Sequence, residues 1–202
     1  MKYIPLTLFA AFAGTSAAAD ASLTNSFTST TVTASAGAVS AEISGTAVGL
    51  SYTNITPSNF AYLAQVSYMT GSLGAIDLTQ TVIGGGVGYA FANDLNVAEG
   101  SGSRTTLGVL YANSNTKFNG SSSSSSDLFL AGGVAFTLAA DVIAGLSLMT
   151  PVDSLGDVTY SSSIGFHSRF GEVSLSLGGS SSNTDGVSVD ATSWGLGYTS
   201  RF

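Results

Sequence analysis

The last nine residues of the sequence, Trp194-Gly-Leu-Gly-Tyr-Thr-Ser-Arg-Phe202, show the pattern from which we predict the fold class. Trp194, Leu196 and Tyr198 occupy every second position, and small or polar residues fill the positions between them. Successive side chains of a β-strand point to opposite faces, so a period of two predicts a strand with one apolar face. An amphipathic helix would instead need apolar steps of three and four, and glycine and serine are too abundant here for a helix.

The same alternation recurs along the chain and gives the number of strands. We predict nine strands near residues 45–54, 59–69, 80–92, 104–113, 127–138, 142–150, 158–170, 172–180 and 189–202. The β-prone stretch from Phe27 to Ala34 could supply a tenth. Bacterial transmembrane barrels made from one chain have an even number of strands. We therefore expect ten strands, with eight as the alternative if two weak segments merge or are lost.

Charge and composition exclude several classes of protein. Only 8% of the 202 residues are charged and 44% are apolar, whereas an ordinary soluble domain has about 25% charged residues. A chain this apolar and this poor in charge is not a disordered protein. The net charge of −7 cannot neutralise phosphates, so we expect no nucleic-acid partner. Because the chain has no cysteine, disulfides and thiolate metal sites are excluded.

Residues 1–19 have the three parts of a secretory signal peptide. Lys2 gives a positive charge, Tyr3 to Phe12 form a short apolar core, and Ala17-Ala18-Ala19 form an Ala-x-Ala cleavage site. The core has about half of the roughly 20 residues that a membrane-spanning helix needs. We therefore expect export, removal of residues 1–19 and a single mature domain of residues 20–202.

The less apolar face of the strands separates a soluble sandwich from a membrane barrel. A sandwich usually exposes charged side chains on that face, whereas here it carries Gly, Ser, Ala and Thr, which suit a narrow barrel lumen. The opposite face carries large aliphatic and aromatic side chains, as a lipid-facing surface requires. The predicted fold class is therefore all-β: a transmembrane antiparallel up-and-down β-barrel.

In these features the chain resembles the small monomeric outer-membrane β-barrel proteins of Gram-negative bacteria. The signal peptide, the alternating segments over residues 24–202 and the final phenylalanine carry the resemblance. It implies a place in the cell outer membrane, contact with outer-membrane lipid, and a C-terminal signal read by the barrel-assembly machinery. That signal would comprise Trp194, Leu196, Tyr198 and Phe202. Ser200 departs from the pattern, since the class usually has an aromatic or apolar residue there, and no subfamily is identified.

The connections predict which way the barrel points. Placing Phe202 at the periplasmic rim puts short turns near residues 55–59, 138–141 and 170–172 inside the cell envelope. Longer polar loops then lie outside, at residues 70–80, 113–127, 151–157 and 180–190. The stretch 93–102 is longer than a periplasmic turn should be, and the serine run 121–126 is expected to be a flexible external loop tip.

The same orientation sorts the aromatic residues into two belts, as expected at the two membrane interfaces. The periplasmic belt comprises Tyr52, Phe60, Tyr62, Tyr89, Phe91, Phe136, Phe166, Phe170, Tyr198 and Phe202, and the outer belt comprises Tyr68, Tyr111, Tyr160 and Trp194.

Few residues are candidates for chemistry. His167, the only histidine, is expected on the lumen face near the periplasmic end, and the chain lacks a nucleophile-elbow motif. We expect no enzyme activity and no catalytic, cofactor-binding or metal-binding residues, because the acidic residues lack calcium-site spacing. Arg169, Glu172 and Arg201 occupy positions that the strand alternation directs into the lumen. With His167 they predict a salt-bridged cluster at the periplasmic rim.

Two main functions are compatible with these features. The first is a structural or interaction barrel that displays acidic, serine-rich external loops to an unknown ligand. The alternative is a small porin-like channel for ions or small solutes, which requires an open lumen. The small lumen side chains permit either an open or a packed interior. A soluble secreted β-protein, such as a matrix component or adhesin, is the third hypothesis.

Overall fold

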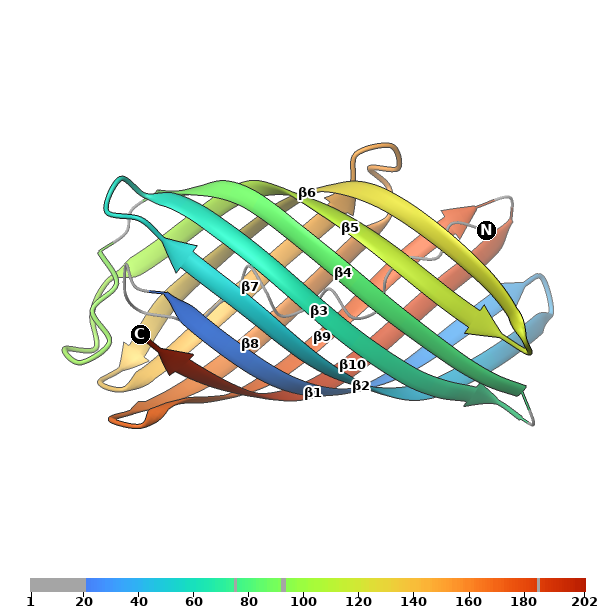
Figure 1. Cartoon of the computed structure of the whole chain (residues 1–202), viewed down its shortest axis with the longest axis horizontal. Helices are drawn as coiled ribbons and strands as arrows, with labels where there is room; N and C mark the ends of the chain where they lie inside the picture. Colours follow the sequence, from blue (N-terminus) through green and yellow to red (C-terminus); the bar gives the residue numbers. More distant parts are fainter. Residues whose placement is uncertain (1–20, 75, 92–93, 185) are drawn as a thin grey trace.

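The computed structural model describes residues 21–74, 76–91, 94–184 and 186–202, through which ten β-strands run. They are β1 (Ser22–Ala36), β2 (Val39–Ile55), β3 (Phe60–Leu73), β4 (Ile76–Phe91), β5 (Ser103–Phe118), β6 (Ser121–Ala139), β7 (Val142–Pro151), β8 (Val158–Ser168), β9 (Gly171–Thr184) and β10 (Val187–Arg201). Each strand pairs antiparallel with its neighbours in sequence, and β1 pairs with β10, so the sheet closes into a barrel (Figure 1). The predicted signal peptide, residues 1–19, lies outside the described residues.

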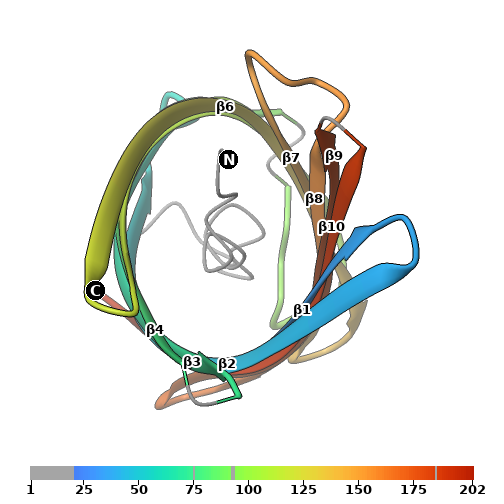
Figure 2. The ribbon, with the colours of Figure 1, turned by 90° about the vertical axis from the view of Figure 1, so that its right-hand side faces the viewer.

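Closure confirms ten strands rather than eight. The tenth strand is β1, which contains the stretch from Phe27 to Ala34 and pairs along its whole length with both β2 and β10. Figure 2 shows the closed ring of strands along the barrel. Ser22 pairs with Arg201, so both strands of the seam reach the same end of the barrel. We call this the terminal end, and the opposite end, which holds the β1–β2 hairpin tip, the distal end. No helix in the described ranges is long and apolar enough to cross a membrane.

Four long loops were predicted from the sequence at the distal end, and for three of them the prediction is wrong. The β3–β4, β5–β6 and β9–β10 hairpins continue as paired strands to their tips, as in the pairing of Phe118 with Ser121. The serine run Ser121–Ser126 is therefore strand β6 and not a flexible loop tip. Backbone pairing needs no apolar side chain, so the strands extend beyond the point where hydrophobic alternation stops. The fourth loop, residues 152–157 between β7 and β8, is present.

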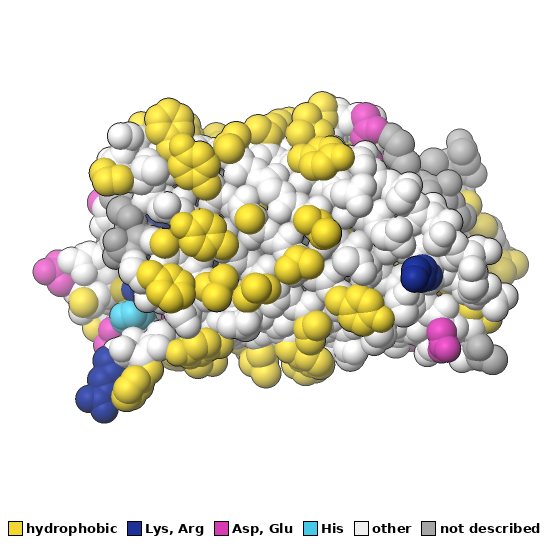
Figure 3. Space-filling model, in the orientation of Figure 1, with side chains coloured by type: hydrophobic (Ala, Val, Ile, Leu, Met, Phe, Trp, Pro, Cys, Tyr) yellow, Lys and Arg dark blue, Asp and Glu magenta, His cyan; other side chains and the backbone are white. Residues whose placement is uncertain are grey.

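The outer surface of the barrel carries a band of large apolar side chains. The alternation places them outward on every strand, with exposed fractions such as 41% at Phe27, 60% at Ile83 and 58% at Leu177. On the face that Figure 3 shows, the hydrophobic side chains lie mostly over the left and central part. The residues predicted as a C-terminal signal belong to this outward set, since Trp194, Leu196, Tyr198 and Phe202 are all exposed. This outward parity confirms the facing predicted from the alternation.

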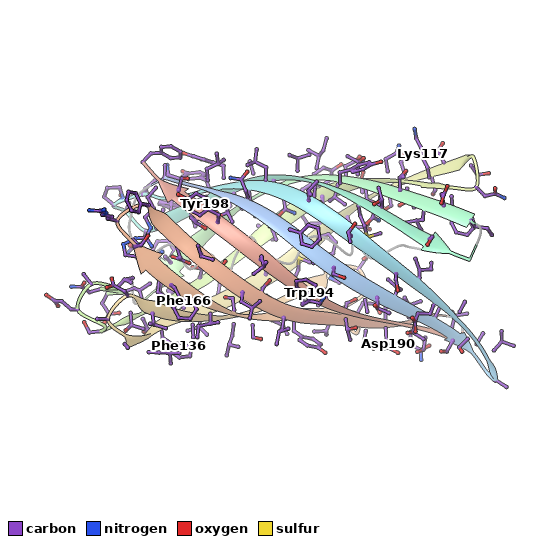
Figure 4. All side chains as sticks on the ribbon, turned by 90° about the horizontal axis from the view of Figure 1, so that it is seen from below. Lys117, Phe136, Phe166, Asp190, Trp194 and Tyr198 are labelled. Atoms are coloured by element: carbon purple, nitrogen blue, oxygen red, sulfur yellow. The ribbon has the colours of Figure 1, made fainter. Side chains whose placement is uncertain are left out.

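The apolar band does not reach the distal end. The outward positions that follow Tyr68, Tyr111 and Trp194 in the distal direction are polar: Thr70, Asn113 and Thr192. In Figure 4, Phe136, Phe166 and Tyr198 lie near the terminal end, Trp194 lies farther along, and Lys117 and Asp190 lie toward the distal end. The predicted outer belt therefore sits partway along the strands, and polar barrel wall extends beyond it.

Candidate functional site

The terminal end of the lumen holds a buried ion pair. Glu172 on β9 and Arg201 on β10 both point inward, and Arg201 Nη2 donates to Glu172 Oε2 at 3.0 Å. The Glu172 side chain is fully buried, and that of Arg201 is 19% exposed. Glycine on the next strand makes the room: a Cβ at Gly165 would stand 2.5 Å from Glu172 Oε1. The inward parity predicted for Glu172 and Arg201 is thus what the structure shows.

His167 lies beside this ion pair on β8. It faces the lumen and stands opposite Glu172 in the strand register, and its backbone N–H donates to the carbonyl of Asp141 at 2.8 Å. Its Nδ1 atom is buried without a hydrogen-bond partner among the described residues. The lumen position expected for His167 is therefore observed.

Arg169 does not join the cluster, and that part of the prediction is wrong. β8 ends at Ser168, so Arg169 and Phe170 form the turn to β9. Strand alternation gives no parity to turn residues. The Arg169 side chain is exposed, and its guanidinium carbon lies 4.5 Å from the centre of the Phe170 ring.

Arg104 takes the place that Arg169 was expected to fill. It is the second residue of β5, faces inward and is only 3% exposed. It is close enough to Arg201 for the two positive charges to repel. The sequence could have indicated the facing of Arg104, because it lies an even number of positions before Thr106 and Leu110, which also face inward. We call Arg104, His167, Glu172 and Arg201 the rim cluster.

Residues 94–102, between β4 and β5, form a loop that packs against the inner surface at the terminal end. Leu95 and Val97 are buried and pack against the inward side chains Ala135 and Ile143. The Val97 carbonyl accepts a hydrogen bond of 2.9 Å from the Asp141 N–H. Gly102 has a φ of 86°, and a Cβ there would clash with the Asp94 carbonyl. This packing explains the length that was an exception in the sequence.

The wall of the lumen has two chemically different sides. Strands β3 to β7 contribute an apolar cluster of Leu63, Val82, Leu110, Ala112, Phe129, Ala131 and Met149. Strands β8 to β10 and β1 contribute mainly hydroxyls and glycine, including Thr30, Thr159, Ser180 and Thr199. Ser147 and Ser161 make a hydroxyl–hydroxyl hydrogen bond of 2.7 Å between neighbouring strands.

The distal part of the barrel presents a polar outer wall. We call the outward faces beyond the apolar band the distal wall, and they carry mainly Ser, Thr and Asn. Asn113 Nδ2 donates to Ser126 Oγ at 2.8 Å across the β5–β6 pair. The described charged groups at this end are Glu42, Asp77, Lys117, Asp127, Asp153, Asp157 and Asp190. The described distal end is therefore acidic. In the described part of the chain, no three or more histidine and acidic side chains come together as a metal site.

Comparisons with known proteins give the fold and no family. No protein-family model and no curated protein sequence matches the chain. Among solved structures, the translocator domain of autotransporter NalP from Neisseria meningitidis matches at 10% identity with a TM-score of 0.52, over 90% of this chain and 88% of that one.

Two further matches have lower TM-scores. Ail, the attachment invasion locus protein of Yersinia pestis, matches at 13% identity and a TM-score of 0.35, over 90% of this chain and 99% of Ail. OprG from Pseudomonas aeruginosa matches at 14% identity and a TM-score of 0.37, over 91% and 97% of the two chains. At 10% identity the likeness to the NalP translocator domain shows the fold alone, which is that of small outer-membrane β-barrels.

Proposed function

We propose that this barrel is a structural or interaction protein of the outer membrane, with its terminal end in the periplasm and its distal wall outside the cell. One observation carries the proposal: the strands continue as paired hairpins beyond the apolar band, and their outward faces there are polar. A polar sheet surface is stable in water and costly in lipid, so this part belongs above the membrane.

The display surface of this proposal is rigid. The expected acidic, serine-rich loops are replaced by the distal wall, in which strands pair to the hairpin tips. The paired strands of the wall hold their side chains in fixed positions. Binding a ligand there would therefore cost less free energy for ordering the protein than binding to a flexible loop. The proposal assigns the barrel no catalytic step, and it assigns Trp194, Leu196, Tyr198 and Phe202 to the contact with the barrel-assembly machinery.

Impermeant thiol labelling tests this placement directly, because the chain has no cysteine of its own. Ser124→Cys lies on the distal wall and should react with a membrane-impermeant maleimide on intact cells. Arg169→Cys, in the exposed β8–β9 turn, should react only after the outer membrane is permeabilised. Labelling of Arg169→Cys but not of Ser124→Cys on intact cells would contradict the proposed orientation.

The alternative function, a small channel for ions or solutes, is favoured by the hydroxyl-rich side of the lumen wall. The inner loop at the terminal end and the apolar side argue for a filled interior, since ten strands enclose little more space than side chains occupy. We expect the purified mature barrel, refolded into planar bilayers, to insert without steady conductance. Regular conductance steps would replace the structural proposal with the channel.

A further inference from the structure

The distal rim of the barrel has a step at β7 and β8. β6 pairs with β5 from Ser121 onward, but its pairing with β7 begins only at Phe129, opposite Pro151. On the far side of the step, β8 pairs with β9 only up to Ser181. Figure 1 shows the β5–β6 hairpin reaching farther to the right than the β7–β8 connection. Ser121–Asp127 therefore has a strand partner on one side only within the described ranges, and we call it the open edge.

The direction of the backbone groups along the open edge follows from one hydrogen bond. The Leu128 carbonyl accepts from the Val152 N–H at 2.8 Å, so Leu128 directs its backbone groups toward the β7 side. Residues of a strand alternate in this direction. Ser122, Ser124 and Ser126 therefore direct their N–H and C=O groups toward the open side, while the residues between them pair with β5.

The open edge lacks the usual protection of sheet edges. Natural edges are shielded by proline, by lysine, by bulges or by an overlying segment. Ser121–Ser126 has neither proline nor charge, and its register with β5 is continuous. The corresponding edge of β2, where pairing with β3 begins at Ser44, is shorter and carries Glu42. The open edge is thus the longer and less protected of these two edges.

The charges around the step indicate which partner fits. Asp127 lies at the base of the open edge, and Asp153 and Asp157 lie on the connection that forms the floor of the step. Asp157 Oδ2 already accepts a hydrogen bond of 2.7 Å from Ser154 Oγ. The nearby cation, Lys117, stands opposite Ser122 on β5 and leaves the surroundings net negative. Complementary charge favours a basic partner.

We propose that the open edge of β6 binds an extended, basic polypeptide segment, which adds as a strand in the position that a longer β7 would occupy. Main-chain hydrogen bonds to Ser122, Ser124 and Ser126 would give affinity, and the carboxylates at the step would select for lysine or arginine. A second copy of the barrel in the same membrane fits the open edge less well. Barrel strands are tilted by about 35–45°, so the strands of two upright barrels related by a two-fold axis along the membrane normal would cross steeply and could not pair side by side. This inference rests on the proposed function, because the edge must face the outside.

A pair of variants separates backbone pairing from side-chain contact. The probe is a fluorescein-labelled peptide of alternating lysine and valine, about nine residues long, titrated against the refolded mature barrel by fluorescence anisotropy. Ser124→Pro removes an N–H that points to the open side, a position where an edge tolerates proline. Loss of one main-chain hydrogen bond should weaken binding about tenfold. Ser124→Ala keeps the N–H and should bind like the unmodified barrel.

The remaining arms test the chemistry of the partner. The same peptide with glutamate in place of lysine should bind more weakly, and Asp127→Asn should reduce the preference for the lysine peptide. Heat-modifiable gel mobility confirms that each variant is a folded barrel. Equal binding by Ser124→Pro and Ser124→Ala, equal binding of both peptides, or no binding of either would overturn the inference. Labelling of Ser124→Cys on intact cells would still support the proposed orientation in that case, so the two failures are distinguishable.

Discussion

Glu172 balances the positive charge at the terminal end of the lumen. It is fully buried between strands that also bring Arg201 and His167 inward, and Arg104 adds a second guanidinium. The parity of β8, β9 and β10 was sufficient to predict the inward facing of His167, Glu172 and Arg201. It failed at Arg169, because a turn residue has no parity. Arg104 was overlooked because it stands at the first residue of the strand predicted there, where strand boundaries are least certain.

At this scale we predict that Glu172→Gln destabilises the barrel. The substitution keeps the shape but removes the negative charge that pairs with Arg201. Loss of the carboxylate partner of this guanidinium should then cost about 1–3 kcal/mol. The measurement is the free energy of unfolding from a urea titration of the refolded barrel in lipid vesicles. Arg169→Gln is the matched control, and its exposed turn position should leave the titration unchanged. Equal values for the two variants would mean that the ion pair contributes little.

Individual strands show where sequence patterns lose their predictive power. The cores of β3, β4 and β6 were predictable because apolar and small residues alternate there. Their distal ends were not, because both faces of Ser121–Ser126 are polar and no alternation remains to read. Pairing continues there through the backbone, which sequence patterns do not report. Residues 94–102 were recognised as unusually long, but their packing depends on Ala135 and Ile143 from two distant strands.

The facing of a single strand can be tested along β9. Leu175 faces outward within the apolar band, and Ser181 faces outward on the distal wall. Leu175→Arg should cost about 2–4 kcal/mol, the price of a cation near the middle of the bilayer, and Ser181→Arg should cost less than about 0.5 kcal/mol. Refolding titrations in urea measure both. If Leu175→Arg is as well tolerated as Ser181→Arg, the apolar band is misplaced on this strand.

Substitution at Val134 extends this test to β6. Val134 lies within the apolar band, while its neighbour Ala135 faces the lumen and is 4% exposed. We expect Val134→Arg to cost about 2–4 kcal/mol through contact with lipid. Ala135→Arg should act through a different cause, since it must displace Leu95 and Val97 of the inner loop. Protease cleavage at residues 94–102 should therefore increase for Ala135→Arg and stay low for Val134→Arg.

For the whole molecule, the closed ten-strand architecture was predictable from the sequence, but the length of the paired strands beyond the apolar band was not. The even strand number required a tenth strand, and the seam between β1 and β10 provides it. Closure of the seam ends with the Phe202 N–H, which donates to the Ala21 carbonyl at 2.9 Å. Phe202 itself is 74% exposed. It therefore adds little packing to the finished fold.

We accordingly predict that Phe202→Ser impairs assembly in cells more than it affects the finished barrel. The side chain is available to the barrel-assembly machinery but is hardly used in the folded state. At native expression, the outer-membrane level of Phe202→Ser should fall well below that of the unmodified chain. Its urea midpoint after refolding in vitro should shift little. Equal outer-membrane levels would argue against a role in assembly.

The seam between the first and last strands also sets an order of events. β1 and β10 are the most distant strands in the chain, so the ring can close only when the whole chain is present. Leu95 and Val97 lie against the inner surface of that ring. Their loop must therefore fold inward while the sheet is still an open ribbon, or enter afterwards through the opening at the terminal end. A chain truncated before Val187 would lack β10 and leave β1 and β9 without the partner that closes this ring.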